Sequence, residues 1–326
     1  MLELVFLGTA ASAPSIQRGL PAQMLLYRDE RFLIDCGEGT QRQILRSGLG
    51  FRRLQRILIT HGHLDHILGL GGLVSTFARW EAVDQLEIYG GARALERIKD
   101  LLFRVVIRGA RPPVPVQLID IHPGTLMEDE EFEVIAFPVT HRGPDCYGYL
   151  FREKPRRPFL PEKAEALGVP AGPERRELVN GHAITLDDGR VIEPDDVLGP
   201  AQPGVAIAIV GDVGRVDNLV DYVRGVDLLV CEATYLKEDQ AMAERFGHLT
   251  AAQAATLAQT ADVRMLALNH LSQRYRVRDI LDETQPIFRA TSVTRDFDHY
   301  QVTRDKITLT NKEFMDKPLV LDQIES

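Results

Sequence analysis

The fold and the chemistry of this chain both depend on the stretch Ile57-Leu58-Ile59-Thr60-His61-Gly62-His63-Leu64-Asp65-His66. Its β-branched, apolar start predicts a buried strand and the following Ile67-Leu68-Gly69-Leu70 predicts a helix, so the polar residues fall in a strand-to-helix loop. Residues two apart on extended backbone point the same way, so His61 and His63 can bind one metal ion while the adjacent aspartate and histidine reach another. The stretch therefore predicts a two-metal site.

The alternative is that each histidine is an ordinary hydrogen-bonded loop residue, which is the better interpretation for a histidine on its own. Four ligand-type residues directly after a buried strand argue against it, because burying that much polar surface without a metal ion is costly. The spacing also resembles the His-x-His-x-Asp-His signature of the metallo-β-lactamase fold superfamily. This resemblance implies a fold and leaves the reaction open.

Three further candidate ligands follow apolar runs later in the chain, each run having the composition of a buried strand. They are His141, Asp212 and His270. Because α/β folds of this kind place their chemistry at the ends of strands, we expect all three to lie close to the first motif.

The seven predicted ligands divide into two sets. An aspartate can offer one oxygen to each of two cations, so Asp212 is predicted to bridge them. The other six are assigned as His61, His63 and His141 to one ion, and as Asp65, His66 and His270 to the other. A set rich in imidazole with carboxylates favours two Zn²⁺ ions per chain, although Mn²⁺ or Fe²⁺ would also fit.

Length and composition predict a protein with a sizeable core. The chain has 326 residues, of which 44% are hydrophobic, and predicted strands and helices alternate in both halves. This alternation favours an α/β sandwich of two β-sheets. No apolar run is long enough to span a membrane, and the first residues form a predicted strand rather than a signal peptide, so we expect a cytoplasmic protein.

Cysteine usage and charge limit the compartment and the partners. Cys36, Cys146 and Cys231 share no Cys-x-x-Cys spacing, which fits a reducing compartment, and each is expected to be a small buried residue. The net charge of −9 argues against a protein that coats nucleic acid non-specifically, and no DNA partner is expected. A local basic patch, or metal ions that meet a phosphate, is still compatible with this charge.

Residues 152–204 differ in composition from the rest of the chain. Arg156 and Arg157 belong to a basic cluster, and the run from Gly168 to Pro173 interrupts regular structure. We interpret this segment as an inserted arm within a single domain of residues 1–326; that it is flexible and binds substrate is implied only by the family resemblance given below. The alternative is an ordinary solvated loop.

Taken together, these features resemble the ribonuclease Z family over essentially the whole chain. The shared motifs keep their order and spacing, which is more specific than the metal motif alone. Besides the metal loop they are Phe6-Leu7-Gly8-Thr9, Asp35-Cys36-Gly37-Glu38-Gly39-Thr40-Gln41, Thr140-His141, Tyr147-Gly148-Tyr149, Leu167-Gly168-Val169-Pro170, Gly172-Pro173, Thr185-Leu186-Asp187-Asp188-Gly189, Gly211-Asp212, Glu232-Ala233-Thr234, His248 and Ser272-Gln273-Arg274-Tyr275.

The resemblance implies an αββα sandwich with an arm that holds the body of a precursor tRNA, in an enzyme that works as a homodimer. The implied reaction is endonucleolytic removal of the 3′ trailer, which leaves a 3′-hydroxyl on the tRNA and a 5′-phosphate on the trailer. The family's His-Glu-Ala-Thr motif begins here with Cys231, and the arm is less basic than usual. The residues implied to bind substrate are Ser272, Arg274, Arg156, Arg157, Gly168, Pro170, Gly172 and Pro173.

Three residues are given catalytic roles. Asp65 is expected to orient the attacking hydroxide and accept its proton. His248 is expected to protonate the leaving oxygen, with Glu232 behind it. His248 precedes a predicted helix, whose N-terminus would disfavour imidazolium while the carboxylate of Glu232 would favour it. The alternative is that His248 only caps or packs against the helix start.

The sequence is also compatible with other functions. A hydrolase of small phosphodiesters or aryl sulfates could use the same metal centre. A thioester hydrolase or a β-lactamase would leave His248, Glu232 and the arm without a role. A non-catalytic RNA-binding subunit would be expected to have lost metal ligands, and none is lost.

Overall fold

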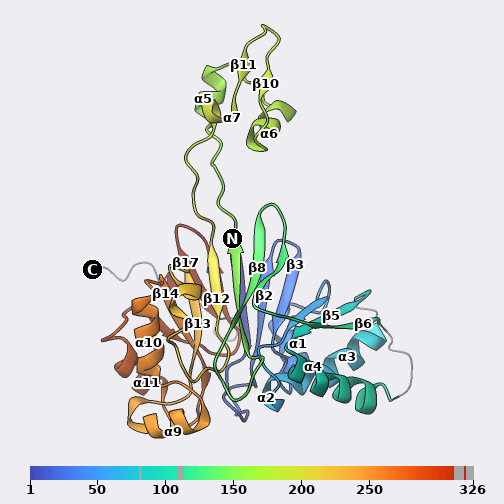
Figure 1. Cartoon of the computed structure of the whole chain (residues 1–326), viewed down its shortest axis with the longest axis vertical. Helices are drawn as coiled ribbons and strands as arrows, with labels where there is room; N and C mark the ends of the chain where they lie inside the picture. The colour runs from blue at the N-terminus through green and yellow to red at the C-terminus, as the bar shows by residue number, and fades with distance from the viewer. Residues whose placement is uncertain (81–82, 109–113, 312–318, 321–326) are drawn as a thin grey trace. The chain divides into compact units, whose positions relative to one another are not determined.

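Two β-sheets form the centre of the fold. The computed structural model describes residues 1–80, 83–108, 114–311 and 319–320. Within these ranges, contacts divide the chain into two units, and the first comprises Met1–Met127, Val134–Phe151 and Val205–Ser326. A nine-stranded and a seven-stranded sheet, built almost entirely from the described residues of this first unit, face each other there (Figure 1).

The first sheet is antiparallel on one side and parallel on the other. The strands from β3 to β6 pair in parallel, and the strand that precedes the metal motif, β4, belongs to this parallel half. Its strand order is β18 (Leu319–Val320), β17 (Ile307–Asn311), β16 (Asp298–Val302), β1 (Leu2–Gly8), β2 (Ala22–Tyr27), β3 (Glu30–Ile34), β4 (Arg56–Leu58), β5 (Leu86–Gly90) and β6 (Val116–Asp120).

The second sheet is also mixed, with a parallel half formed by its four later strands. Three of these strands, β12, β13 and β14, are buried along their whole length and mostly apolar, as expected for a parallel sheet that is covered on both sides. The strand order is β15 (Thr291–Val293), β14 (Met265–Leu271), β13 (Leu228–Ala233), β12 (Ala206–Ile209), β9 (Tyr147–Glu153), β8 (Phe132–Pro138) and β7 (Gly124–Glu128).

Aromatic side chains fill the layer between the sheets. The rings of Phe32 on β3 and Phe151 on β9 lie 5.6 Å apart between centroids. The hydroxyl of Tyr149 on β9 donates a 2.6 Å hydrogen bond to the carbonyl oxygen of Ile59, just after β4. These contacts tie the metal-motif strand of one sheet to the other sheet.

Helices cover the outer face of each sheet (Figure 1). On the first sheet, α1 (Thr40–Ser47), α3 (Gly69–Trp80) and α4 (Ala92–Lys99) bury apolar side chains against the strands. On the second, α10 (Ala251–Thr260) and α11 (Val277–Thr284) do the same. The layers are therefore helix, sheet, sheet and helix, and the predicted αββα sandwich is confirmed.

The remaining described helices of the first unit are short. They are α2 (Leu64–Ile67), α8 (Val220–Val223), a 3₁₀ turn (Lys237–Asp239) and α9 (Gln240–Phe246). Helix α4 ends at Lys99, and the chain continues directly as a π-helical segment, Asp100–Val106. No helix among the described residues is long and apolar enough to cross a membrane.

The second unit comprises Glu128–Glu133 and Arg152–Gly204. It contains α5 (Pro161–Ala166), α6 (Pro173–Val179), α7 (Pro194–Val197) and a two-stranded sheet of β10 (Ile184–Thr185) and β11 (Val191–Ile192). Its small core buries Ala164, Val169, Leu178, Ile192, Val197 and Leu198. The segment predicted as an arm thus folds around apolar side chains of its own.

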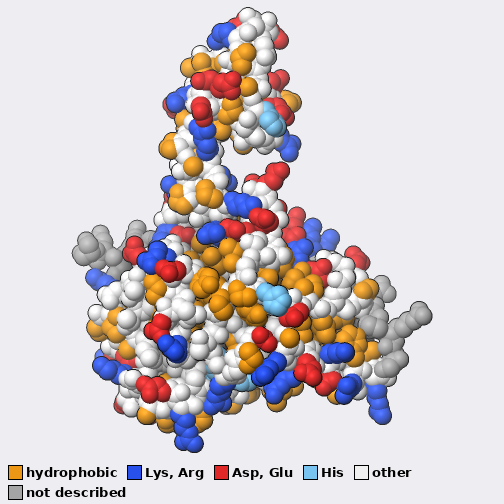
Figure 2. All heavy atoms as spheres, in the orientation of Figure 1, with side chains coloured by type: hydrophobic (Ala, Val, Ile, Leu, Met, Phe, Trp, Pro, Cys, Tyr) orange, Lys and Arg blue, Asp and Glu red, His pale blue; other side chains and the backbone are white. Residues whose placement is uncertain are grey.

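Charged side chains of both signs are mixed, rather than separated, on the face of the molecule that Figure 2 shows. On the face shown in Figure 2, acidic and basic groups alternate over both units. In the second unit several basic side chains pair with carboxylates: Arg152 with Glu133, Lys154 with Glu128, Arg157 with Asp195 and Arg190 with Asp188. This pattern fits the prediction that the protein does not coat nucleic acid non-specifically.

Candidate metal centre

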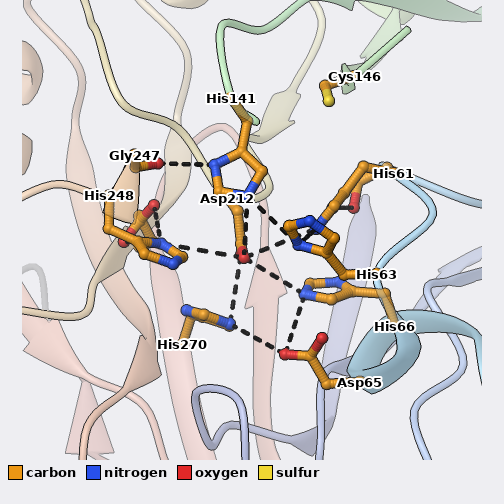
Figure 3. A network of polar contacts seen from close by, with 12 residues as sticks. His61, His63, Asp65, His66, His141, Cys146, Asp212, Gly247, His248 and His270 are labelled. Atoms are coloured by element: carbon orange, nitrogen blue, oxygen red, sulfur yellow. Dashed lines mark hydrogen bonds and ion pairs between the residues drawn. The ribbon is translucent and has the colours of Figure 1, made fainter. Parts of the chain in front are cut away.

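The seven predicted metal ligands meet at one edge of the two sheets (Figure 3). His61 and His63 lie in the connection after β4, as expected. Asp65 and His66, by contrast, belong to the short helix α2, with His63 as its N-cap. His141 follows β8, Asp212 follows β12, and His270 lies near the end of β14.

The first predicted set forms a tight group of nitrogen atoms. His61 Nε2 lies 2.8 Å from His63 Nδ1, which in turn lies 3.4 Å from His141 Nε2. Asp212 Oδ2 is 3.7 Å from His61 Nε2. Three imidazole nitrogens and a carboxylate oxygen that converge in this way are suited to share one cation.

The second predicted set lies on the other side of Asp212. Asp65 Oδ2 is 3.7 Å from both His66 Nε2 and His270 Nε2. Asp212 Oδ2 lies 3.5 Å from His66 Nε2, and Asp212 Oδ1 lies 3.3 Å from His270 Nε2. Asp212 therefore stands between the two sets with one or both oxygens directed at each, the position expected of a bridging ligand.

The polar atoms of this cluster fit a bound divalent cation. His66 Nε2, His270 Nε2 and Asp212 Oδ1 are buried and, in the described part of the chain, have no hydrogen-bond partner. Buried polar atoms without a partner are costly, so three of them in one cluster indicate a missing ligand. Imidazole with carboxylate is a donor set typical of zinc, which makes a divalent metal site the natural interpretation.

The protonation states also suit a cation. Burial, together with the neighbouring His141, lowers the pKa of His63 to about 4, and burial lowers the pKa of His61 and His141 as well. These rings are neutral at pH 7 and can offer a lone pair. Burial opposes ionisation of Asp65, but the neighbouring imidazoles of His270 and His66 outweigh it and lower its pKa to about 2.

His66 differs from the other histidines. Burial opposes its protonation, but the carboxylates of Asp212 and Asp35 outweigh burial and raise its pKa well above the ordinary value. A cation held by Nε2 would take the place of that proton, so metal binding would be coupled to proton release at this residue.

A second layer of oxygen atoms holds the rings in orientation. In four of the predicted histidine ligands Nδ1 faces an oxygen atom: Asp35 Oδ2 at 2.7 Å from His66, the Gly247 carbonyl at 2.6 Å from His141, Thr234 Oγ1 at 2.9 Å from His270, and Thr60 Oγ1 at 3.1 Å from His61. A proton on Nδ1 leaves Nε2 directed into the cluster. The sequence motifs that contain Asp35 and Thr234 were recognised above only as family resemblance, and this supporting role was not predicted.

Asp35 should matter for metal affinity without itself touching the ion. Its carboxylate also accepts hydrogen bonds from the backbone N–H and the hydroxyl of Thr60, both at 2.8 Å. We expect Asp35→Asn to lower metal affinity by about 10- to 100-fold, as measured by competition with a chelator. Asp298→Asn, at another buried aspartate, is the matched control. Equal affinities in the two variants would contradict a role for Asp35.

His248 and Glu232 form a buried pair beside the cluster (Figure 3). His248 Nδ1 lies 2.9 Å from Glu232 Oε1, and Glu232 also accepts hydrogen bonds from the backbone N–H of Val213 and the hydroxyl of Thr234. Burial opposes the charge on His248, but the carboxylate of Glu232 outweighs it and raises the pKa of His248 to about 9. His248 is therefore an imidazolium that can release a proton.

His248 lies just before a helix, as expected. It lies between the end of α9 at Phe246 and Thr250, the N-cap of α10. Thr250 and Gln253 form a capping box at the start of α10. The guanidinium of Arg142 also opposes the positive charge on His248.

The residues predicted to bind substrate are divided between the two units. Ser272 and Arg274 follow β14 in the first unit, where Arg274 lines an open cavity with Tyr275 and several carboxylates. The other six, Arg156, Arg157, Gly168, Pro170, Gly172 and Pro173, belong to the second unit. The structure thus groups the metal ligands with His248 and Glu232, and substrate binding by the second unit stays a prediction.

Comparison with known proteins defines the family. Residues 19–153 match the model of the metallo-beta-lactamase superfamily. A ribonuclease Z of Bradyrhizobium sp. (strain ORS 278) is 46% identical over 93% of this chain and all of the relative, and one of Gemmatimonas aurantiaca is 38% identical over 89% of this chain and 93% of the relative.

A solved structure agrees with these relatives. The short form of human tRNase Z superimposes with a TM-score of 0.60 and 28% identity, covering 92% of this chain and 99% of the human one. Sequence identity and coverage at this level leave one conclusion: this chain belongs to the ribonuclease Z family, on the metallo-β-lactamase fold.

Proposed function

We propose that this protein is a zinc-dependent endoribonuclease that removes the 3′ trailer from precursor tRNA. The observation that carries the proposal is the complete set of seven ligand-type side chains with the His248–Glu232 pair directly beside it. Ribonuclease Z relatives that align over almost the whole chain support the substrate.

The products follow from the bond that is hydrolysed. Water adds to the scissile phosphorus and the bond to O3′ of the tRNA breaks. The trailer keeps the phosphate at its 5′ end, and the tRNA keeps a 3′-hydroxyl once its leaving oxygen has gained a proton. When bound, two divalent cations supply the Lewis acidity that makes water nucleophilic near neutral pH and that neutralises the charge of the phosphate.

The side chains supply orientation and proton transfer. Asp65, with its low pKa, is ionised and can accept the proton of the attacking water. His248, on the opposite side of Asp212, holds a proton that Glu232 stabilises and can donate it to the leaving O3′. Glu232 acts as a positioning residue, because its hydrogen bonds to Val213 and Thr234 fix the carboxylate behind His248.

One assay tests this function. The purified protein is incubated with a precursor tRNA and with a small chromogenic phosphodiester, with and without added zinc, and the ends of the RNA products are mapped. Zinc-dependent release of an intact trailer with a 5′-phosphate is the expected result. Rapid hydrolysis of the small diester with no cleavage of the precursor would instead favour a hydrolase of small phosphodiesters or aryl sulfates.

The second unit is proposed to hold the body of the tRNA. Phosphate contacts by arginine dominate nucleic-acid affinity and make it dependent on salt. Many basic side chains of the unit pair with carboxylates, but Arg156 and Arg176 are exposed and have no ion-pair partner among the described residues. These two arginines are therefore available to phosphates.

We expect the double variant Arg156→Ala/Arg176→Ala to weaken cleavage of precursor tRNA on the order of tenfold and to reduce its salt dependence. Hydrolysis of the small phosphodiester should be retained, since it needs no contact with the second unit. The control Arg224→Ala/Arg289→Ala removes the same charge from the first unit. Equal losses in the two double variants would show a general charge effect and contradict the assignment.

Homodimer formation and a cytoplasmic location are also proposed, and both rest on the family resemblance. Light scattering on the purified protein tests the first, with twice the chain mass of 36.5 kDa as the expected value. Cell fractionation tests the second.

A further inference from the structure

A cavity of about 150 Å³ opens beside the metal centre, against His61 and His63. Its other wall carries three guanidinium groups, from Arg93, Arg97 and Arg142, and one carboxylate, from Asp145. The positive charges exceed the negative one, so the cavity favours an anion over a cation. All of these residues belong to the first unit.

The three arginines are held in different ways. Arg97 donates a 2.9 Å hydrogen bond to the carbonyl oxygen of Gly62, inside the metal loop. Arg142 stacks its guanidinium over the ring of Phe246, 5.1 Å from the centroid. Arg93 is exposed and makes no hydrogen bond or ion pair with any described residue. Arg93 is therefore the guanidinium most available to a ligand, with Arg142 beside it.

The backbone brings these groups close to the metal loop. A side chain at Gly62 would place its Cβ 2.9 Å from the Cα of Ala94, so helix α4 packs directly on the loop at this point. Arg93 and Arg97 are four residues apart on α4 and share one face of it. The first turn of α4 contains no acidic residue, so no carboxylate of that turn competes for an anion.

The cavity lies away from His248 across the metal cluster. The ring of His63 contacts those of His61 and His141, whereas the ring of His248 contacts those of His141 and His270. Figure 3 shows His248 on one side of Asp212 and Cys146, which also lines the cavity, on the other. A polynucleotide with its scissile phosphate at the cluster would extend in both directions.

We propose that this cavity binds the first phosphate of the trailer downstream of the cleaved bond, with Arg93 and Arg142 as its contacts. The inference rests on the proposed function. Cleavage there releases O3′ of the tRNA toward His248 and leaves the phosphate on the trailer, so the trailer continues toward the arginines. Guanidinium groups match phosphate oxygens in charge and in hydrogen-bond geometry.

The test uses precursor tRNAs that differ only in the trailer, with metal-loaded, full-length protein. One has a single-nucleotide trailer and so lacks any phosphate beyond the scissile one. A second has three trailer nucleotides. A third is identical to the second, except that a neutral methylphosphonate replaces the first downstream phosphate.

Arg93→Ala should lower kcat/KM for the three-nucleotide trailer about tenfold more than for the other two substrates, because only that substrate offers the charged group. Arg93→Lys should restore part of the loss. Lys99→Ala, which removes a positive charge from the same helix outside the cavity, is the matched control. With unaltered protein, the methylphosphonate alone should cost about tenfold.

Two results would overturn the inference. If Arg93→Ala lowers kcat/KM equally on all three precursors, Arg93 supports the structure of the metal loop. If unaltered protein cleaves the methylphosphonate precursor as fast as its charged counterpart, the charge of that phosphate is not recognised. Failure of the proposed function looks different: unaltered protein would then cleave none of the precursors while still hydrolysing a small phosphodiester, and the inference would fall with it.

Discussion

Replacing His63 with alanine should abolish hydrolysis of both precursor tRNA and a small phosphodiester. The variant should also lose at least one of about two metal ions expected per chain. His63 Nδ1 faces the ring nitrogens of His61 and His141, so the substitution removes a nitrogen atom from the first ligand set. Elemental analysis and kcat/KM on both substrates measure the effect.

Alanine at position 63 is expected to remove a metal ligand without disturbing the fold. His63 is only partly buried, so alanine there opens no sealed cavity, and thermal unfolding of the metal-free protein should change little. His122→Ala, at an exposed histidine of the same unit, is the control and should keep both metal and activity. A fully active, metal-free His63→Ala protein would contradict the metal centre altogether.

The second large effect is expected at His248. His248→Ala should keep its metal ions and bind precursor tRNA normally, yet lose about 10² to 10⁴ in kcat. Nδ1 of His248 faces Glu232, while its Nε2 makes no hydrogen bond to any described residue and is available to a substrate. The loss should be smaller with a nitrophenyl leaving group, because a nitrophenolate departs without a proton.

The pH dependence offers an independent readout. A general acid is active in its protonated form, so activity that depends on it falls as pH rises through its pKa. This alkaline limb should be absent from His248→Ala. Glu232→Gln removes the carboxylate charge that raises the pKa of His248, so the limb should move to lower pH. Metal loss in His248→Ala, or an equal loss on both substrates, would show a structural role instead.

Local patterns in the sequence were enough for the fold class and for the identity of the candidate ligands. The apolar runs before His61, His141 and Asp212 form the strands β4, β8 and β12, as their composition predicts. The box from Thr250 to Gln253 likewise depends on residues three apart. Such features involve neighbours along the chain, so they can be read without the fold.

The atoms within the site depend on tertiary structure. His63 turns Nδ1 toward the cluster while His61 and His141 turn Nε2, a difference that residue type does not encode. His270 has a positive φ of 53°, where the register between β13 and β14 shifts, so its direction depends on a strand pairing. The alternation of side chains along a strand cannot by itself predict the direction of a side chain at such a shift.

The supporting groups are distant in sequence from the residues they serve. Asp35 lies 31 positions from His66, and Thr234 lies 36 from His270. The arginine cavity likewise combines one face of α4 with the loop after His141. Contacts between residues so far apart in sequence depend on how whole strands and helices pair and pack. That packing is the sum of many weak interactions over both sheets. The sequence by itself determined which residues are candidates for the chemistry, and the packing of the sheets decided which atoms meet and which charges surround them.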